Sequence, residues 1–535
     1  MTFDLISPAR LREKMAPDAT AEYALIDVRE LGVHSEGHPF FAVPLPLSQL
    51  ELKALKLLPR KSVPLYILDQ GPELPLAERA AELLAGFGYS DIRLVERGVE
   101  GWREAGFEIF SGINVPSKAF GEFVEEAYGT PHITASDLAE RQKQGEKIVI
   151  LDSRPFREFH RMSIPGGIDM PGAELVHRVY ETVPDADTQI VVNCAGRTRS
   201  IIGAQSLINA GIPNPVAALK DGTMGWHLAD LKLAHKENRV APPPGPDAGS
   251  RSQQSADQVA TRFGVKTIDL DTLEAWQQER ETRSLYLLDV RDEAEYLAGH
   301  FPGALHAPGG QLVQATDEYV ATRNARIVLI DGESVRAVMT ASWLLQMNWP
   351  EVLVLQTSPD RFTETGPSAG AEIEQTPVIS AHELDAALAS GEPIAVIDLG
   401  SSPAYRAGHI PGAYWAIRAR LDKDLIFVPP MGLIVLTSKD GDIAHLAAQE
   451  VARLRPGTLI RVLDGGTAAW KQASLPLEKG ETQLLSRLDD LWSRPYDTSD
   501  PEEVRKRMQD YLTWEVGLMQ QIERDGLVRF QRFEP

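Results

Sequence analysis

The residue best suited to chemistry is Cys194, the single cysteine in 535 residues. Directly before it, the apolar run 190–193 (IVVN) predicts a short buried strand. After it, apolar residues at helical spacing over 201–208 predict a helix, with Ser200 as its N-cap. The sulfur is therefore expected on a tight loop between the end of a strand and the start of a helix, where backbone amides and the positive end of a helix dipole gather.

Two arginines, Arg197 and Arg199, add full positive charge to this loop. A lone cysteine is often only a small buried hydrophobic residue. A structural cysteine, however, gains nothing from two guanidinium groups within five residues, since each would have to be desolvated. The charges instead favour the thiolate form of Cys194 and an anionic ligand, so we predict a nucleophilic cysteine.

Three segments, in order along the chain, resemble the signatures of rhodaneses, the sulfurtransferases that carry sulfur as a cysteine persulfide. The loop Cys194–Arg199 (CAGRTR) resembles their six-residue active-site loop. Upstream, Leu151–Phe159 (LDSRPFREF), followed by Ile164–Gly167 (IPGG), resembles the first signature, and downstream Asp221–Trp226 (DGTMGW) resembles the closing one.

This resemblance implies that the Cys194 thiolate takes the outer sulfur of thiosulfate or a related anionic donor and passes it to cyanide or a thiol. Loop amides would stabilise the persulfide, and Arg197 and Arg199 would hold the anionic donor. No cofactor and no metal is implied. The expected substrate-binding residues are Ala195, Gly196, Arg197, Thr198, Arg199 and Arg178.

Other candidates near the loop are expected to be structural. Asp152 and Arg154 are predicted to form an ion pair behind the loop, and Trp226 is predicted to pack beside the site. Three histidines, each after a glycine and before a turn, resemble metal ligands by number only: His38, His300 and His409. We expect each of them to have a structural role in the turn of its own domain.

The pattern around Asp152 occurs four times along the chain. Each copy is an apolar strand that ends in an aspartate, namely Asp27, Asp152, Asp289 or Asp398. A second strand follows, and the interval from the aspartate to the position aligned with Cys194 is 42 residues in three copies and 40 in the fourth. The repeats are therefore domains rather than units of a solenoid.

The position of Cys194 is occupied by Asp69, Asp331 and Ser438 in the other three copies. An aspartate cannot form a persulfide, and no base that would activate Ser438 is evident. One domain is thus expected to carry sulfur and three are not. The third copy also lacks a clear closing signature near Phe362.

We predict an α/β fold of four tandem rhodanese-like domains, each a small parallel sheet with helices on both faces. The expected domains are residues 1–115, 116–238, 258–372 and 373–480, with Cys194 in the second. Residues 239–257 form a predicted Pro/Ser-rich linker that is flexible after its prolines. Residues 481–535 form a predicted helical tail, with a helix from Asp500 through Arg524.

Composition limits the partners and the compartment. The net charge of −22 disfavours a general nucleic-acid binder. One cysteine cannot form an intrachain disulfide, and no stretch resembles a signal peptide or a membrane helix. We therefore expect a cytoplasmic protein that has small-molecule substrates and no nucleic-acid or membrane partner. The tail helix is a candidate contact for a homo-oligomer.

Three alternatives remain at this stage. A phosphatase or arsenate reductase of related fold needs five residues between Cys and Arg, whereas four separate Cys194 from Arg199. A mercaptopyruvate enzyme would have a loop without two arginines. The third alternative is a persulfide carrier or sulfur sensor without turnover, whose cysteine-less domains bind a partner.

Overall fold

The computed structural model describes residues 2–72 and 75–534, and in this part of the chain four five-stranded sheets form. Every strand pair in them is parallel, and all four sheets have the same order. In the first sheet this order is β1-β5-β4-β2-β3. The repeats predicted from the aspartate-ending strands are thus four copies of one topology, and the predicted α/β fold is confirmed.

Domain 1 is built on strands whose alternate residues enter two separate cores. Ile26 of its second strand packs on one face of the sheet and Leu25 on the other, so both faces are buried. Its elements are β1 (Asp4–Ile6), α1 (Pro8–Lys14), β2 (Ala24–Asp27), α2 (Leu31–Glu36), β3 (Val43–Pro44), η1 (Leu47–Gln49), α3 (Leu50–Leu57), β4 (Leu65–Leu68), α4 (Leu76–Gly86), β5 (Ile92–Val95) and α5 (Gly98–Glu104).

Domain 2 carries Cys194 and follows the same plan, with Val191 and Val192 on opposite faces of its sheet. Its elements are α6 (Val115–Tyr128), β6 (His132–Ile133), α7 (Ala135–Lys143), β7 (Ile148–Asp152), α8 (Phe156–Arg161), β8 (Ile168–Asp169), α9 (Glu174–Thr182), β9 (Gln189–Asn193), α10 (Thr198–Asn209), β10 (Val216–Leu219) and α11 (Gly222–Leu228).

Domain 3 shares one continuous apolar core with domain 2. Trp343 crosses this interface and donates from Nε1 to Ser206 Oγ at 2.9 Å. Its elements are β11 (Lys266–Ile268), α13 (Leu270–Gln278), β12 (Leu285–Asp289), α14 (Glu293–Ala298), β13 (Leu305–His306), α15 (Gly309–Gln314), η2 (Thr316–Glu318), β14 (Arg326–Ile330), α16 (Val335–Gln346), β15 (Val352–Leu355) and η3 (Pro359–Arg361). The short η3 stands where the other domains have a closing helix.

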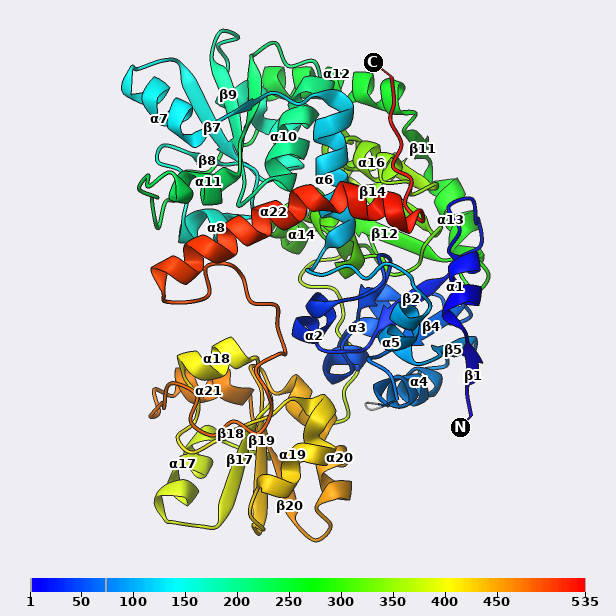
Figure 1. Ribbon diagram of the computed structural model, residues 1–535, viewed down its shortest axis with the longest axis vertical. Coiled ribbons are helices and arrows are strands. Elements are labelled where there is room, and N and C mark those ends of the chain that lie inside the picture. The colour runs from blue at the N-terminus through cyan, green and yellow to red at the C-terminus, as the bar shows by residue number, and fades with distance from the viewer. Residues whose placement is uncertain (1, 73–74, 535) are drawn as a thin grey trace.

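Domain 4 lies at one end of the molecule (Figure 1). Its Arg418 joins domain 1 through two contacts with the Glu51 carboxylate, at 2.8 and 2.6 Å. Its elements are β16 (Val378–Ile379), α17 (Ala381–Ala389), β17 (Ile394–Asp398), α18 (Ser402–Ala407), β18 (Tyr414–Trp415), η4 (Arg418–Arg420), α19 (Leu421–Asp424), η5 (Leu425–Phe427), β19 (Leu433–Thr437), α20 (Asp442–Leu454), β20 (Leu459–Leu463) and α21 (Gly466–Gln472).

The C-terminal segment returns from domain 4 to the middle of the molecule. Its helix α22 (Pro501–Asp525) begins after the cap Asp500, as predicted, and crosses α6 (Figure 1). Leu518 and Ile522 are buried against α6, whereas Val516 is 53% exposed. The segment therefore belongs to the packed body of the protein.

The predicted flexible linker is wrong over its second half. Residues from Pro246 onward form α12 (Pro246–Phe263), which packs between α9 of domain 2 and α16 of domain 3. Pro246 occupies the first turn, where its missing N–H costs nothing. Small residues of the segment predicted to be flexible lie on the buried face of this helix, and Ser252 Oγ donates to the carbonyl oxygen of His177 at 3.0 Å.

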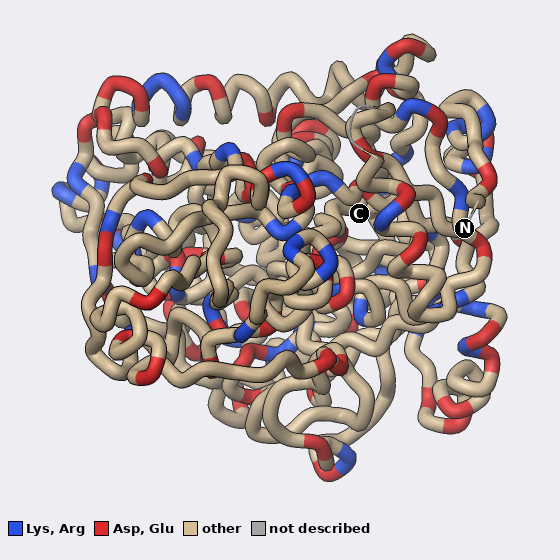
Figure 2. The backbone as a smooth tube through the Cα atoms, turned by 90° about the horizontal axis from the view of Figure 1, so that it is seen from below, with Lys and Arg blue, Asp and Glu red and all other residues tan. Residues whose placement is uncertain are grey.

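Charges are interleaved along the chain. Figure 2 shows acidic and basic positions interspersed along the tube. Among the described residues, no helix combines the length and the apolar character that a membrane crossing requires.

Limited proteolysis tests the ordered α12. We expect trypsin to cut slowly at Arg251, because the helix is packed and this guanidinium lies 4.0 Å from the Tyr180 ring centroid. Ala256→Pro breaks the helix at a fully buried position and should expose Arg251 and Arg262 to cleavage. Rapid cutting at Arg251 in the wild-type protein would contradict the structure.

Candidate active site

Cys194 lies directly after β9, at the carboxyl end of its sheet, and is 2% exposed. Helix α10 begins at Thr198, two residues before the predicted N-cap Ser200, with Arg197 in the cap position. Ser200 is instead inside the first turn. Its Oγ donates to the Arg197 carbonyl oxygen at 2.8 Å and accepts from the Cys194 thiol at 3.5 Å.

A polar layer behind the loop fixes its position. Asn193 donates from Nδ2 to Asp152 at 2.8 Å, and Ser153 Oγ donates to the Asn193 carbonyl oxygen at 2.8 Å. Asp152 also accepts from Arg154 at 2.8 and 2.7 Å. The same buried pair occurs as Asp27–Arg29 and Asp289–Arg291 in domains without a cysteine. Because the pair recurs in domains that lack a cysteine, we infer that it supports the fold.

The closing turn holds the loop from the other side. Thr223 donates to the Cys194 carbonyl oxygen from its amide at 2.8 Å and from Oγ1 at 2.9 Å. This approach requires Gly222, whose φ is +54° and where a Cβ would lie 2.4 Å from that oxygen. Trp226 is buried in an apolar core cluster of domain 2 and donates from Nε1 to the Lys232 carbonyl oxygen at 3.1 Å.

The equivalent loops of domains 1 and 3 bind their own carboxylates. Asp331 accepts from the amides of Glu333 and Ala337, each at 3.0 Å, and from the amide of Ser334. Asp69 accepts from the amides of Gly71 and Ala77 at 2.9 and 3.1 Å. Each loop is thus an anion-binding ring of N–H groups that the side chain at the cysteine position occupies.

In domain 2 the corresponding amides belong to Gly196, Arg197 and Ser200. Among the described residues they donate neither to Cys194 Sγ nor to any acceptor outside their own helix. A cysteine side chain ends at Sγ, one bond short of where an aspartate places its carboxylate oxygens, so it does not reach their position. The ring can therefore take one further anionic atom beyond Sγ.

A cavity of about 300 Å³ opens in front of Cys194. Ala195, Gly196, Arg197, Thr198 and Arg199 line it, so the predicted loop residues are brought together. Its other walls come from the α6 region, from α8 of domain 2, from domain 3 and from the C-terminal segment. They include Lys118, Arg157, Gln311, Gln314, Trp492, Arg494, Tyr496 and Tyr511.

Arg199 borders the cavity but is tied to Glu158 by two contacts of 3.0 and 2.9 Å. Burial opposes the charge of the Glu158 carboxylate, yet the Arg199 guanidinium outweighs it and lowers the pKa of Glu158 to about 2. Domain 3 repeats this pair as Arg336–Glu295 although it lacks a cysteine. Arg199 thus supplies a fixed positive field near Cys194.

Two predicted anion ligands have other partners. The Arg197 guanidinium is bound by three carboxylates: Glu122 at 2.7 and 2.8 Å, Asp221 at 3.3 Å, and Glu125. The placement of Arg178 at the site is wrong, because its side chain lies outside the cavity, between domains 2 and 3. It binds Glu174, the Ala241 carbonyl oxygen and Asp292 there.

The sequence motifs did not identify the residues that α22 places over the loop. Glu515 is fully buried and accepts from Thr198 Oγ1 at 3.2 Å, from Tyr511 at 3.0 Å and from Lys118 Nζ at 3.1 Å. Tyr511 lies on the same helix and borders the cavity. No motif links it to a cysteine more than 300 residues earlier.

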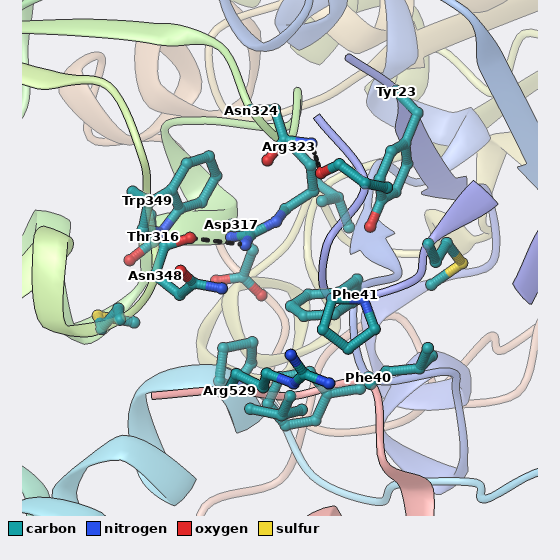
Figure 3. Close-up of a pocket in the computed structure, with 18 of the residues that line it drawn as sticks. Tyr23, Phe40, Phe41, Thr316, Asp317, Arg323, Asn324, Asn348, Trp349 and Arg529 are labelled. Carbon is teal, nitrogen blue, oxygen red and sulfur yellow. Dashed lines mark hydrogen bonds between the residues drawn. The ribbon is translucent and has the colours of Figure 1, made fainter. Parts of the chain in front are cut away.

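A second cavity, where domains 1 and 3 meet the C-terminal segment, is a structural joint (Figure 3). Its centre is Arg323, whose guanidinium carbon lies 4.7 Å from the Phe41 ring centroid and 4.2 Å from that of Trp349. Arg323 also donates to the Asn348 carbonyl oxygen at 3.1 Å. The cavity holds about 60 Å³, the space of about two water molecules.

The three histidines lie in their own turns. His38, His300 and His409 are each buried and pair their backbone with a segment that follows the domain's last helix or turn. Each also stacks on the ring four residues before it, His34, Tyr296 or Tyr405.

Gly222→Ala tests the close approach beneath the cysteine loop. Gly129→Ala is the matched control, because Gly129 has a similar φ of +63° but no atom within 4 Å of the added Cβ. Both variants carry the left-handed backbone cost of about 1–2 kcal/mol. Only Gly222→Ala also displaces the loop, so we expect a larger loss of unfolding free energy and an altered rate of Cys194 alkylation. Equal losses in denaturant unfolding, with unchanged alkylation, would contradict this account.

Comparisons with known proteins agree with this architecture. The family model of the rhodanese-like domain matches residues 134–229, 269–364 and 380–473, more than half of the chain. A crystal structure of thiosulfate sulfurtransferase from Pseudomonas aeruginosa is 45% identical over 99% of this chain and 100% of that chain, with a TM-score of 0.94.

A curated relative, the HTH-type transcriptional regulator Rv0324 of Mycobacterium tuberculosis, is 34% identical over 110 residues. These residues are 20% of this chain and 47% of that protein, so the chain spans about half the length of this relative. With the family match and the full-length structural likeness, the chain belongs to the rhodanese family.

Proposed function

We propose that the protein is a sulfurtransferase that moves sulfane sulfur from thiosulfate to cyanide or a thiol through a persulfide on Cys194. The observation that carries the proposal is the ring of amides around Cys194. In domains 1 and 3 an aspartate carboxylate fills this ring, whereas in domain 2 a sulfur atom lies beneath it. The outer sulfur of a persulfide on Cys194 is anionic and would accept hydrogen bonds from these amides where the carboxylate oxygens accept them in domains 1 and 3.

The reaction proceeds in two displacements. The Cys194 thiolate attacks the outer sulfur of thiosulfate, a new S–S bond forms, and the old one breaks as sulfite leaves with its electron pair. The acceptor then attacks the outer persulfide sulfur, and Cys194 leaves as the thiolate. With cyanide the product is thiocyanate, and no external oxidant or reductant is required.

Arg199 stabilises both anionic forms of the sulfur from a fixed position. Burial opposes its charge, but Glu158 and, more weakly, Cys194 raise its pKa above the ordinary value of an arginine. The cation therefore persists, and its bidentate bond to Glu158 holds it in place. The loop amides act at the outer sulfur, one bond further from the chain.

The geometry favours small acceptors over a protein partner. Cys194 is 2% exposed behind a cavity whose walls come from domain 2, domain 3 and the C-terminal segment. A cavity with such walls admits a small anion, cyanide or a small thiol to Cys194. A folded partner protein is too large to reach the sulfur. This supports turnover rather than the alternative of a persulfide carrier without turnover.

Intact mass after incubation with thiosulfate tests the proposal. The wild-type protein should gain the mass of one sulfur atom, and cyanide should remove it. Cys194→Ala should gain nothing, and because Cys194 is the single cysteine, the comparison assigns the site. No gain in the wild-type protein would contradict thiosulfate as donor. A stable gain that neither cyanide nor thiols remove would favour the carrier.

A further inference from the structure

A substrate anion that enters the cavity in front of Cys194 needs a positive group to bind it, and both loop arginines already have carboxylate partners. Arg197 is bound by three carboxylates, and Arg199 is bound by Glu158. The Arg199 pair also has a copy in domain 3, where no cysteine is present. Neither guanidinium is free to form a bidentate contact with an oxyanion without losing a carboxylate partner.

Two other arginines line the same cavity, Arg157 on α8 and Arg494 on the C-terminal segment. Within the described part of the chain, neither guanidinium has an ion pair or a hydrogen bond. The positive charge of Arg494 contributes to the lowered pKa of Glu158, which places Arg494 near the Arg199–Glu158 pair. In a chain with a net charge of −22, two unpaired cations at one cavity favour an anionic ligand.

Arg494 lies on residues 492–497, a segment that we call the strap, which is outside all four sheets. A turn fixes the strap: the Arg494 amide donates to Asp497 Oδ2 at 3.0 Å, and the Asp497 amide donates to the Arg494 carbonyl oxygen at 3.1 Å. Domain 2 holds this turn through Arg161, which lies 3.8 Å from the Asp497 carboxylate and 4.9 Å from the Tyr496 ring centroid. The backbone that carries Arg494 is therefore positioned, and its side chain is left for a ligand.

We propose that Arg494 of the strap, together with Arg157, binds the oxyanion end of the sulfur donor while its outer sulfur faces Cys194. This deepens the proposed function and rests on it. A sulfonate-like donor and a thiol acceptor that carries a carboxylate would both present an anionic group to these arginines. We assign the bound anionic group to the donor. Arg494 is then a substrate-positioning residue that no rhodanese-like domain contributes.

Steady-state kinetics of Arg494→Gln and Arg157→Gln, with cyanide as acceptor, test this assignment. Loss of one charge-assisted contact should raise the KM for thiosulfate about tenfold or more. The value of kcat should change less than twofold, because the persulfide machinery is intact. Raising the ionic strength should increase the wild-type KM and affect the variants less. Arg494→Lys should bind thiosulfate more tightly than Arg494→Gln but less tightly than the wild type, because lysine restores the charge but not the planar guanidinium that donates two parallel hydrogen bonds.

Arg487→Gln is the matched control. Arg487 lies on the same C-terminal segment, its side chain is 84% exposed, and it does not line the cavity. This variant should keep the wild-type KM. A KM for thiosulfate in Arg494→Gln and in Arg157→Gln that stays within twofold of the control would overturn the proposal. So would an unchanged KM for thiosulfate combined with a raised KM for glutathione as acceptor, because the arginines would then serve the acceptor.

The failure of this assignment is distinguishable from the failure of the proposed function. The persulfide on Cys194 is measured by intact mass in the same preparations. Its absence from the wild-type protein contradicts the proposed function. Its presence there, with unchanged KM values in both arginine variants, contradicts only the role of Arg157 and Arg494.

Discussion

The site depends on the backbone amides that ring the loop after the central strand of each sheet. Amides at the start of a helix have no acceptor within that helix, so something else must accept from them. Domains 1 and 3 meet this requirement with Asp69 and Asp331, and in domain 4 Ser438 Oγ accepts from the amide of Gly441 at 3.2 Å. Domain 2 places a cysteine there instead, and its amides can serve an anionic atom that arrives with the substrate.

The need for an acceptor at these amides limits which ligands the loops of the cysteine-less domains can bind. Asp331 already occupies the ring of domain 3, so that loop cannot take an external anion without losing its own carboxylate. Domain 3 contributes walls instead: Gln311 and Gln314 border the cavity of Cys194, and α16 shares the apolar core of domain 2. The sulfur site is therefore built by several domains, although its reactive atom belongs to one.

The sequence was sufficient for the repeats and for the loop, because both follow from local patterns. Four strands end in aspartate, and a second strand ends 40 or 42 residues after each of them at the position aligned with Cys194, which predicted four copies of one topology. The single cysteine between a strand and a helix predicted the site. Other features depend on tertiary packing. The Ser/Gln-rich part of α12 is ordered because its small side chains fit between two domains, and Arg178 turned toward an interface rather than toward the loop. The strap has no motif, and only the path of the chain from domain 4 brings Arg494 to Cys194.

The most direct measurement of the central claim is a crystal structure of the protein after reaction with thiosulfate. We expect one additional sulfur atom on Cys194 Sγ, within hydrogen-bond distance of the amides of Gly196, Arg197 and Ser200, and unchanged aspartates in the loops of domains 1 and 3. An additional sulfur that points away from these amides, or a Cys194 that stays unmodified while the protein turns over, would contradict the account.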